Sequence, residues 1–397
     1  MRWPMNKTPM LPIALPKLGE PEIAAVARVI GSGWITQGPE VAAFEAEFAA
    51  YCGAREAIAA SNCTTALHLV LHALGIKSSD EVIVPSLSFI ASANAIAHTG
   101  ATPVFADVAL DDLNIDADAI EAAITPRTKA IMAVHQLGMP ARIEAIAALA
   151  ERRGLALVED AACAIGSRVE SGGWRQVGAP FGIAACFSFH PRKLLTTGDG
   201  GMITTDDPEF AARLRRLRQH GMSVTDRERH ASGRVIFESY DEIGFNYRLT
   251  DIQAAIGREQ LKRIPELVAE RRRLVELYRV RLTAIPGVIC PADRADTETN
   301  WQSFHVFLPT AAEQHAVMES MLAAGVATRR CVMCSHLEPA YESTRAKNVG
   351  NRSLANSEYA AAHGIVLPLF AGMSETDITT VCEALRGALA TTVRKAS

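Results

Sequence analysis

The sequence lacks an excess of charge of either sign, an apolar run long enough to cross a membrane, and any tandem repeat. Its 397 residues include 40 Lys and Arg and 44 Asp and Glu, which gives a formal net charge of -4. This balance provides no long-range attraction to nucleic acid or anionic lipid. The N-terminal segment has no apolar core of signal-peptide length. We therefore expect a cytoplasmic protein with no nucleic-acid or membrane partner.

Cysteine occurs eight times, but without the spacing of a disulfide framework. In a long chain without a signal peptide, scattered cysteines are expected to be reduced and mostly buried. Cys331 and Cys334 form a single C-x-x-C, with His336 just beyond it. A structural zinc site needs four ligands, and the sequence offers no second C-x-x-C. We expect no metal site.

Hydrophobic residues make up 49% of the chain and charged residues 21%, which is typical of a packed globular protein. From about residue 20 to 265, short apolar runs alternate with helical patterns such as 142–153. Strands that are apolar throughout and separated by helices predict a mainly parallel sheet covered on both faces. The expected strands are Glu56–Ala60, Glu81–Val84, Thr102–Phe105, Ala130–His135, Ala156–Glu159, Ala184–Phe189 and Met202–Thr204.

The C-terminal third has a different pattern, with two charged helices, short strands and a last amphipathic helix that begins at Ser374. The chain is long enough for one large domain and a smaller one. The sequence therefore predicts an α/β protein with a large domain over residues 1–264, N-terminal segment included, and a small α+β domain over 265–397.

In an open α/β sheet, ligands bind at the carboxyl ends of the strands. The segment Ser61–His68 follows the first expected strand and precedes a helix. Its small polar residues, Thr64 and Thr65 among them, leave hydroxyls and backbone N–H groups that can bind a phosphate. An ordinary Ser/Thr helix cap explains the same cluster, and the sequence alone leaves both interpretations open.

Asp160 ends another apolar run, Leu155–Asp160. A carboxylate at this edge of the sheet can pair with a cationic ring nitrogen or with a metal, while the alternative is an N-cap for a helix over 161–164. Phe89 lies just past the strand 81–84, where its ring would stack on a planar cofactor or pack in the core.

Lys193 lies just beyond the strand 184–189 and before the glycine-rich turn 196–201. A desolvated lysine there is expected to have a lowered pKa and can form a Schiff base with an aldehyde. The alternatives are a point charge for phosphate and a surface loop lysine, although the glycines allow close approach to a ligand. A phosphate cradle, an acid, a lysine and a stacking ring together are what pyridoxal phosphate requires.

The sequence resembles the pyridoxal-phosphate sugar aminotransferases of the DegT/DnrJ/StrS type over nearly its whole length, from Ser32–Pro39 to Leu367–Phe370. The most specific match is Phe187–Lys193 with its Thr-Gly-Asp-Gly-Gly tail. The resemblance implies an aspartate-aminotransferase-like fold (fold type I) with a seven-stranded sheet. It also implies that Lys193 is the catalytic residue, which holds the cofactor as an internal aldimine, and that a pyridoxamine phosphate intermediate follows.

The resemblance further implies that Ser188, Thr64 and Thr65 bind the cofactor phosphate, that Asp160 pairs with the ring nitrogen and that Phe89 stacks on the ring. Cys163 stands where such enzymes commonly have Gln or His. A thiol is a weak hydrogen-bond donor, so the contact of Cys163 with the cofactor's phenolic oxygen is open.

Asn246 lies in Gly244–Gln253, a segment that resembles one reaching into the neighbouring subunit's site. There Asn246 would touch the cofactor phosphate, which implies a homodimer with active sites at the subunit interface. The alternative for Asn246 is an ordinary turn residue.

The implied reaction moves an amino group, from L-glutamate, to a keto group of a nucleotide-linked deoxysugar. Arg329 and Arg330 lie in a segment that resembles a loop near the family's substrate entrance, where arginine would grip a carboxylate or a diphosphate; a solvated basic turn is the alternative. His305 and His336 are candidates of the same kind.

Two other functions remain open. The first keeps the cofactor chemistry but acts on a cyclitol or another carbocyclic ketone in antibiotic biosynthesis. The second is a non-catalytic regulator that binds pyridoxal phosphate, for which the sequence shows no DNA-binding module or basic tail.

Overall fold

The computed structural model describes residues 10–224, 229, 232–350 and 352–392. The N-terminal residues 1–9, part of the segment in which we expect no signal peptide, lie outside the described residues. The strands of the large sheet are β1 (Glu56–Ala60), β2 (Glu81–Pro85), β3 (Thr102–Ala106), β4 (Thr128–Val134), β5 (Ala156–Asp160), β8 (Ala184–Ser188) and β9 (Gly201–Thr205). All seven expected strands are therefore present, with ends that differ by at most two residues.

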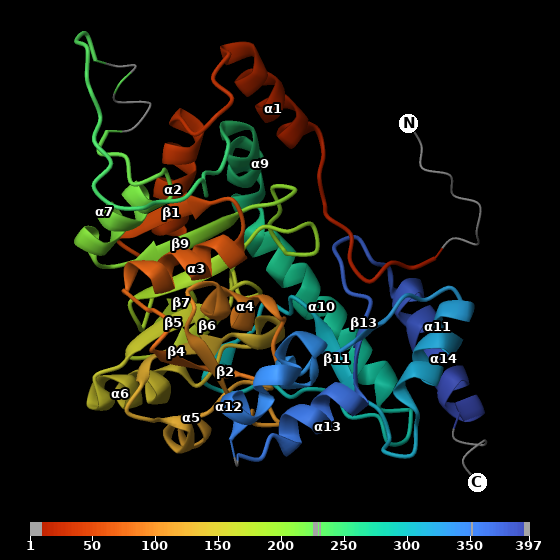
Figure 1. Cartoon of the computed structure of the whole chain (residues 1–397). Coiled ribbons are helices and arrows are strands. Elements are labelled where there is room, and N and C mark those ends of the chain that lie inside the picture. The colour runs from red at the N-terminus through yellow and green to blue at the C-terminus, as the bar shows by residue number, and fades with distance from the viewer. Residues whose placement is uncertain (1–9, 225–228, 230–231, 351, 393–397) are drawn as a thin grey trace.

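The large sheet has the order β1-β9-β8-β5-β4-β2-β3 (Figure 1). The strand β9 pairs antiparallel with both β1 and β8, and every other neighbouring pair is parallel. Six strands thus run in one direction and β9 runs in the other, which confirms the mainly parallel sheet. The carboxyl ends of the six strands lie along the same edge.

The helices are α1 (Glu20–Ser32), α2 (Pro39–Cys52), α3 (Cys63–Ala73), α4 (Ala91–His98), α5 (Ala117–Ala123), α6 (Ile143–Arg153), α7 (Pro208–Leu217), α9 (Asp251–Leu261), α10 (Ile264–Leu282), α11 (Gln314–Ala323), α12 (Arg345–Val349), α13 (Ala355–His363) and α14 (Glu375–Thr392). Capping explains two of the helix ends. Gly53 ends α2 in the left-handed region at φ 77°, which glycine adopts without a steric penalty. The hydroxyl of Ser374 accepts a hydrogen bond from the Asp377 backbone N–H at the start of α14.

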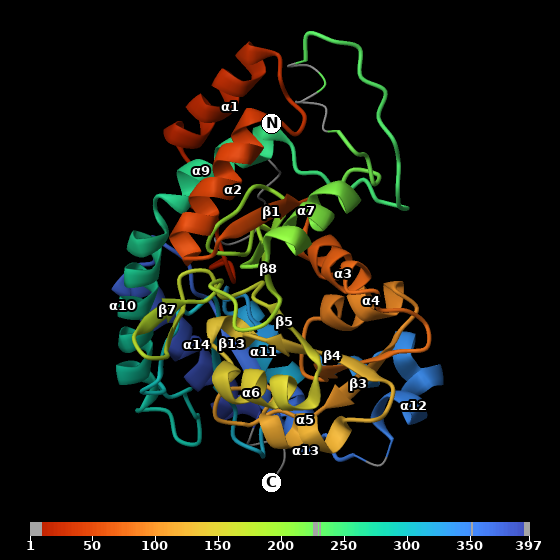
Figure 2. The ribbon, with the colours of Figure 1, turned by 90° about the vertical axis from the view of Figure 1, so that its left-hand side faces the viewer.

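Both faces of the large sheet are covered by helices. Ala57 and Ala59 of β1 belong to the core under α2, α5, α6 and α9, while Ile58 and Ala60 belong to the core under α3, α4 and α7. Figure 2 shows α2 and α9 on one side of the sheet and α3 and α4 on the other. This alternation requires strands that are apolar on both faces, as their sequences are.

A second unit forms around the antiparallel sheet β11 (Phe304–Phe307), β13 (Gly364–Leu367) and β12 (Arg329–Arg330). It packs with α11, α14 and one side of the long helix α10 (Figure 1). Tyr278 of α10 stacks on Phe304 at 5.1 Å between ring centroids, and its hydroxyl donates to the Pro368 carbonyl. A domain boundary near residue 264 stays a prediction.

A small sheet of β6 (Arg168–Glu170), β7 (Trp174–Gln176) and β10 (Thr297–Glu298) was not expected from the sequence. Its strands have only two or three residues each and are mostly polar, so they show no apolar run.

The segment 232–243 extends away from the body of the molecule, beyond α7 (Figures 1 and 2). It exposes Val235, Phe237 and Ile243, whose side chains are 85%, 92% and 86% accessible. Within the described ranges, no helix combines the length and the apolar character that crossing a bilayer requires.

Candidate active site

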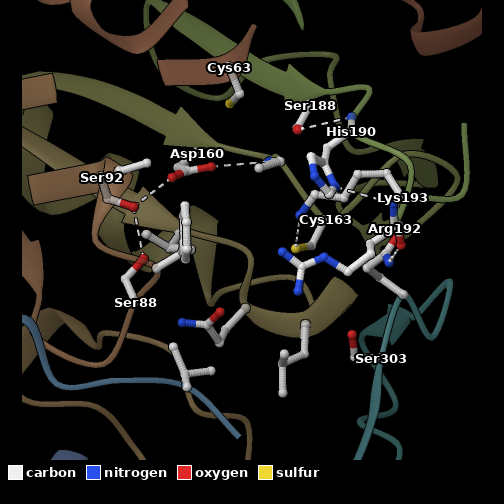
Figure 3. Close-up of a pocket in the computed structure, with 18 of the residues that line it drawn as sticks. Cys63, Ser88, Ser92, Asp160, Cys163, Ser188, His190, Arg192, Lys193 and Ser303 are labelled. Atoms are coloured by element: carbon white, nitrogen blue, oxygen red, sulfur yellow. Dashed lines mark hydrogen bonds between the residues drawn. The ribbon is translucent and has the colours of Figure 1, made fainter. Parts of the chain in front are cut away.

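A cavity of about 600 Å³ lies at the carboxyl ends of β1, β2, β4, β5 and β8. Residues of β12 and β13 complete its wall. Figure 3 shows Asp160, Cys163 and Lys193 around the cavity, with Ser303 on a facing segment. Most of the predicted site residues line it, namely Thr64, Thr65, Phe89, Asp160, Cys163, Ser188, Lys193 and Arg329. These residues come from distant parts of the sequence and meet because their strands end at one edge.

The start of α3 forms one wall of the cavity. Asn62 caps this helix by accepting a hydrogen bond from the Thr65 backbone N–H at 2.9 Å, and the Thr65 hydroxyl donates to the Asn62 carbonyl at 2.8 Å. Both donors of Thr65 are therefore satisfied within the cap. Helix geometry leaves the N–H groups of Cys63 and Thr64 without an intrahelical acceptor, and they suit an anion. Thr64 is thus better placed than Thr65 to donate to a phosphate.

Ser188 and Gly201 complete this anion cradle. The Ser188 side chain lines the cavity, and its oxygen is 3.5 Å from the His190 backbone nitrogen. A Cβ on Gly201 would lie 2.6 Å from the carbonyl carbon of Asn62 and 2.8 Å from the nitrogen of Cys63. Any larger residue at the start of β9 would displace the loop that begins α3. The close approach therefore requires glycine.

Asp160 is 5% exposed at the end of β5, and both of its carboxylate oxygens are held. Oδ2 accepts a hydrogen bond from the Ser92 hydroxyl at 2.7 Å, and Oδ1 accepts one from the Ala162 backbone N–H at 3.1 Å. The hydroxyl oxygen of Ser88 lies 2.8 Å from that of Ser92 (Figure 3). Residues 161–164 form turns rather than a helix, so the alternative of a helix N-cap is wrong.

Lys193 extends its amine to the sulfur of Cys163, with 2.9 Å between Nζ and Sγ. Burial lowers the pKa of Lys193, but attraction to Cys163, Cys63 and the Asp160 carboxylate outweighs it, and the net shift is upward. The expectation of a lowered pKa is therefore wrong for the protein without a ligand. The sulfur of Cys163 contributes most to this upward shift, and the Asp160 carboxylate also stabilises the protonated amine.

Phe89 is 55% exposed, although it lines the cavity at the end of β2. Its neighbours Leu87 and Ser88 are buried. A large apolar ring left exposed inside a cavity is available to a planar ligand, which favours the stacking role over core packing.

Positive charge gathers at the same cavity. Arg192 and Arg329 both line it, and no carboxylate in the described part of the chain pairs with either guanidinium. Burial and repulsion from Arg192 and Arg330 lower the pKa of Arg329. Arg330 is different, because its guanidinium donates to Glu338 at 2.9 Å. Two uncompensated guanidinium groups favour an anionic ligand.

Three predicted residues do not line the cavity. His336 joins β2 to α13, with Nδ1 2.6 Å from the Ser86 hydroxyl and Nε2 3.1 Å from Glu358. His305 is buried in β11, where burial lowers its pKa to about 4. Asn246 is exposed and forms a bridge with Gln219.

Ser92, Arg192 and Gln302 are among the lining residues that were not singled out from the sequence. Ser92 lies at the start of α4, close to the end of β2, and this position was the available signal. Arg192 directly precedes Lys193, and this adjacency was the available signal for it.

These groups match pyridoxal phosphate. The cradle at α3 and Ser188 suits the phosphate, the fixed carboxylate of Asp160 suits a protonated ring nitrogen, Phe89 suits the ring face and the Lys193 amine suits an aldehyde. Each group of the cofactor therefore has a matching residue in the cavity.

Comparison with known proteins gives a consistent result. Residues 16–386 match the DegT/DnrJ/EryC1/StrS aminotransferase family. The chain is 38% identical over 383 residues to the spore coat polysaccharide biosynthesis protein SpsC of Bacillus subtilis (strain 168), covering 95% of this chain and 96% of that protein.

Two solved structures share the fold. The aminotransferase TlmJ of Streptoalloteichus hindustanus is 37% identical with a TM-score of 0.87, covering 96% of this chain and 99% of TlmJ. S. venezuelae DesV, solved with a ketimine intermediate, is 36% identical with a TM-score of 0.85, covering 96% and 98%. The chain therefore belongs to the DegT/DnrJ/EryC1/StrS family and is a pyridoxal-phosphate-dependent aminotransferase.

Proposed function

We propose that the enzyme transfers an amino group from L-glutamate to the keto group of a nucleotide-linked deoxysugar. The observation that carries this proposal is the uncompensated pair Arg192 and Arg329 in the same cavity as Lys193. Both proposed substrates are anions, one through carboxylates and the other through a diphosphate. The relative SpsC, a polysaccharide biosynthesis protein, supports a sugar acceptor.

Within this proposal, the N-terminus of α3, Thr64 and Ser188 hold the cofactor phosphate, and Phe89 covers one face of the ring. Asp160 would keep a proton on the ring nitrogen, because its negative charge stabilises a protonated nitrogen and two hydrogen bonds fix its carboxylate in place. When bound, pyridoxal phosphate supplies an aldehyde and a ring that accepts the electron pair left when a Cα proton departs.

Lys193 then performs the proton transfers. Its neutral Nζ takes the proton from the Cα of the amino donor as a general base, and the resulting ammonium returns a proton as a general acid. The reverse sequence serves the keto acceptor. Cys163, 2.9 Å from Nζ, lies beside the atom that carries this proton.

We also propose that two copies associate and share their active sites. Tyr247 lines the cavity, and the adjoining Asn246 is exposed. The segment 232–243 leads into them and presents Val235, Phe237 and Ile243 to solvent. Apolar side chains exposed to this degree suit an interface.

The test is the visible absorption spectrum of the purified enzyme with pyridoxal phosphate, before and after L-glutamate is added. We expect a visible band that bleaches with glutamate and returns with a keto-sugar nucleotide. A band that does not change when glutamate is added would show that glutamate is not the amino donor.

Free nucleoside diphosphates should compete with the acceptor, and no competition would favour a carbocyclic ketone instead. Sedimentation should give twice the 42.7 kDa chain mass.

Replacing Arg329 with leucine is expected to raise the KM of the substrate that it binds by about 10- to 100-fold, the value of one charge-assisted hydrogen bond. The turnover number should change little, because Arg329 does not carry the reacting proton. Measuring each half-reaction separately shows which substrate is affected. Arg28→Leu is the control, since Arg28 is exposed, pairs with Glu40 and lies outside the cavity. Unchanged KM values for both substrates in the Arg329 variant would contradict the anion site.

Replacing Cys163 with alanine is expected to lower the pKa of Lys193 in the cofactor-free enzyme, because Cys163 raises it. Capture of pyridoxal phosphate requires the neutral amine, so the capture rate rises with pH through this pKa. The rate profile of the variant should therefore shift to lower pH. Cys290→Ala, half-buried and outside the cavity, serves as the control. A shift to higher pH would show that the sulfur does not stabilise the ammonium.

A further inference from the structure

Gln302 holds the backbone on both sides of Lys193. It lies just before β11, is 6% exposed and lines the cavity. Its Oε1 accepts a hydrogen bond from the Leu194 backbone N–H at 3.0 Å, and its Nε2 donates to the Arg192 carbonyl at 2.6 Å. One carboxamide therefore binds both peptide groups that flank the lysine.

Gln302 is itself fixed by its neighbours. Its backbone N–H donates to Asn300 Oδ1 at 2.8 Å, and the Asn300 amide donates to the carbonyls of Cys163 and Ile165 at 2.8 and 2.7 Å. The buried guanidinium of Arg271 donates to the carbonyl of Gln302 at 3.0 Å. The segment 300–302 thus connects the turn that carries Lys193 with the turn that carries Cys163.

The turn around Lys193 needs such support, because residues 189–200 form neither helix nor strand. Its local contacts include a hydrogen bond from the Lys193 N–H to the His190 carbonyl at 2.8 Å. The position of Nζ depends on where this turn lies relative to Cys163. A displacement of about 1 Å at a reacting group can cost about 10²-fold in rate.

We propose that Gln302 is a positioning residue that aligns Lys193 for capture of the cofactor and for proton transfer. The proposal rests on the role of Lys193 in the proposed function. Both ends of the amide are needed, because Oε1 must accept from the Leu194 backbone N–H and Nε2 must donate to the Arg192 carbonyl. Gln302 acts through the backbone and does not itself touch the reacting atoms.

Gln302→Leu removes both hydrogen bonds at similar volume. A matched control is Gln314→Leu, because Nε2 of Gln314 also donates to two backbone carbonyls, those of Ala361 and Gly364, outside the cavity. We expect equal losses of thermal stability in the two variants. Only Gln302→Leu should lower turnover and the rate of pyridoxal phosphate capture by the cofactor-free enzyme, each by about 10- to 100-fold. Equal capture rates in the two variants would overturn the proposal.

Gln302→Glu provides a second test with a pH-dependent result. A protonated carboxyl has one accepting oxygen and one O–H donor, so it can replace both hydrogen bonds of the amide. An ionised carboxylate only accepts and repels the Arg192 carbonyl. The capture rate of this variant relative to the natural enzyme should rise as the pH falls. A ratio that does not change with pH would contradict the need for a donor.

Capture of pyridoxal phosphate is measured without amino donor or acceptor. If no glutamate or keto-sugar reacts but Gln302→Leu still slows capture, the proposed substrates fail and the positioning role stands. If capture is unaffected while glutamate and keto-sugar react, the positioning role fails and the proposed function stands.

Discussion

Lys193→Ala is expected to lower turnover by at least about 10⁴-fold, the upper end of what general acid–base catalysis alone contributes. The variant loses both the amine that captures the cofactor and the group that moves the Cα proton. The visible band of the natural enzyme should be absent or altered. Initial rates with glutamate and a keto acceptor, together with the spectrum, measure the effect.

The lysine is not needed for folding, because its side chain lines the cavity and, among the described residues, its amine hydrogen-bonds to the Cys163 sulfur alone. Circular dichroism and the melting temperature of Lys193→Ala should therefore stay close to those of the natural enzyme. Lys262→Ala is the matched control, since Lys262 is 61% exposed and pairs with Glu259. A Lys193 variant that keeps most of its activity would refute the assignment of the catalytic residue.

Asp160→Asn is expected to lower turnover by about 10²–10³-fold, the range for removal of one preorganised group that stabilises charge in an active site. Asparagine keeps the size of the side chain and an oxygen for the Ser92 hydroxyl, but it loses the negative charge that holds a proton on the ring nitrogen. The nitrogen-15 chemical shift of labelled cofactor reports this proton directly. We expect the shift of the variant to move to that of an unprotonated ring.

Asp207→Asn is the control for this change. Asp207 caps α7 by accepting from the N–H groups of Glu209 and Phe210, and asparagine caps helices equally well. It should leave turnover unchanged. If Asp160→Asn gives a protonated ring nitrogen and full activity, another group supplies the charge.

Most of the large sheet could be predicted because the sequence pattern of each strand is local. Each central strand is a short apolar run bounded by turn residues, and burial on both faces requires such a run. The position of the cavity followed from the strand ends, since Thr64 lies in the helix that follows β1, Asp160 ends β5 and Lys193 lies in the turn after β8. These features needed no knowledge of which segments pack together.

The remaining features depend on contacts between distant segments. Gln302 looks like an ordinary polar residue, and its role follows from lying against the Lys193 turn. His305 and His336 have the residue type of a substrate ligand, but the fold buries one in β11 and pairs the other with Ser86. The upward pKa shift of Lys193 likewise comes from Cys63, Cys163 and Asp160, which lie on three other segments.

The pairing of β1 with β9 joins the first strand of the large sheet to the last one in the chain. During synthesis, the loop at Asn62 lacks its contact with Gly201, and the Lys193 turn lacks its hydrogen bonds to Gln302, until those residues have been added to the chain. At about 5–20 residues per second, the ribosome needs roughly 15–60 s to reach that glutamine. Pyridoxal phosphate thus meets a complete binding site only near the end of translation, and a nascent chain offers the lysine without its surroundings.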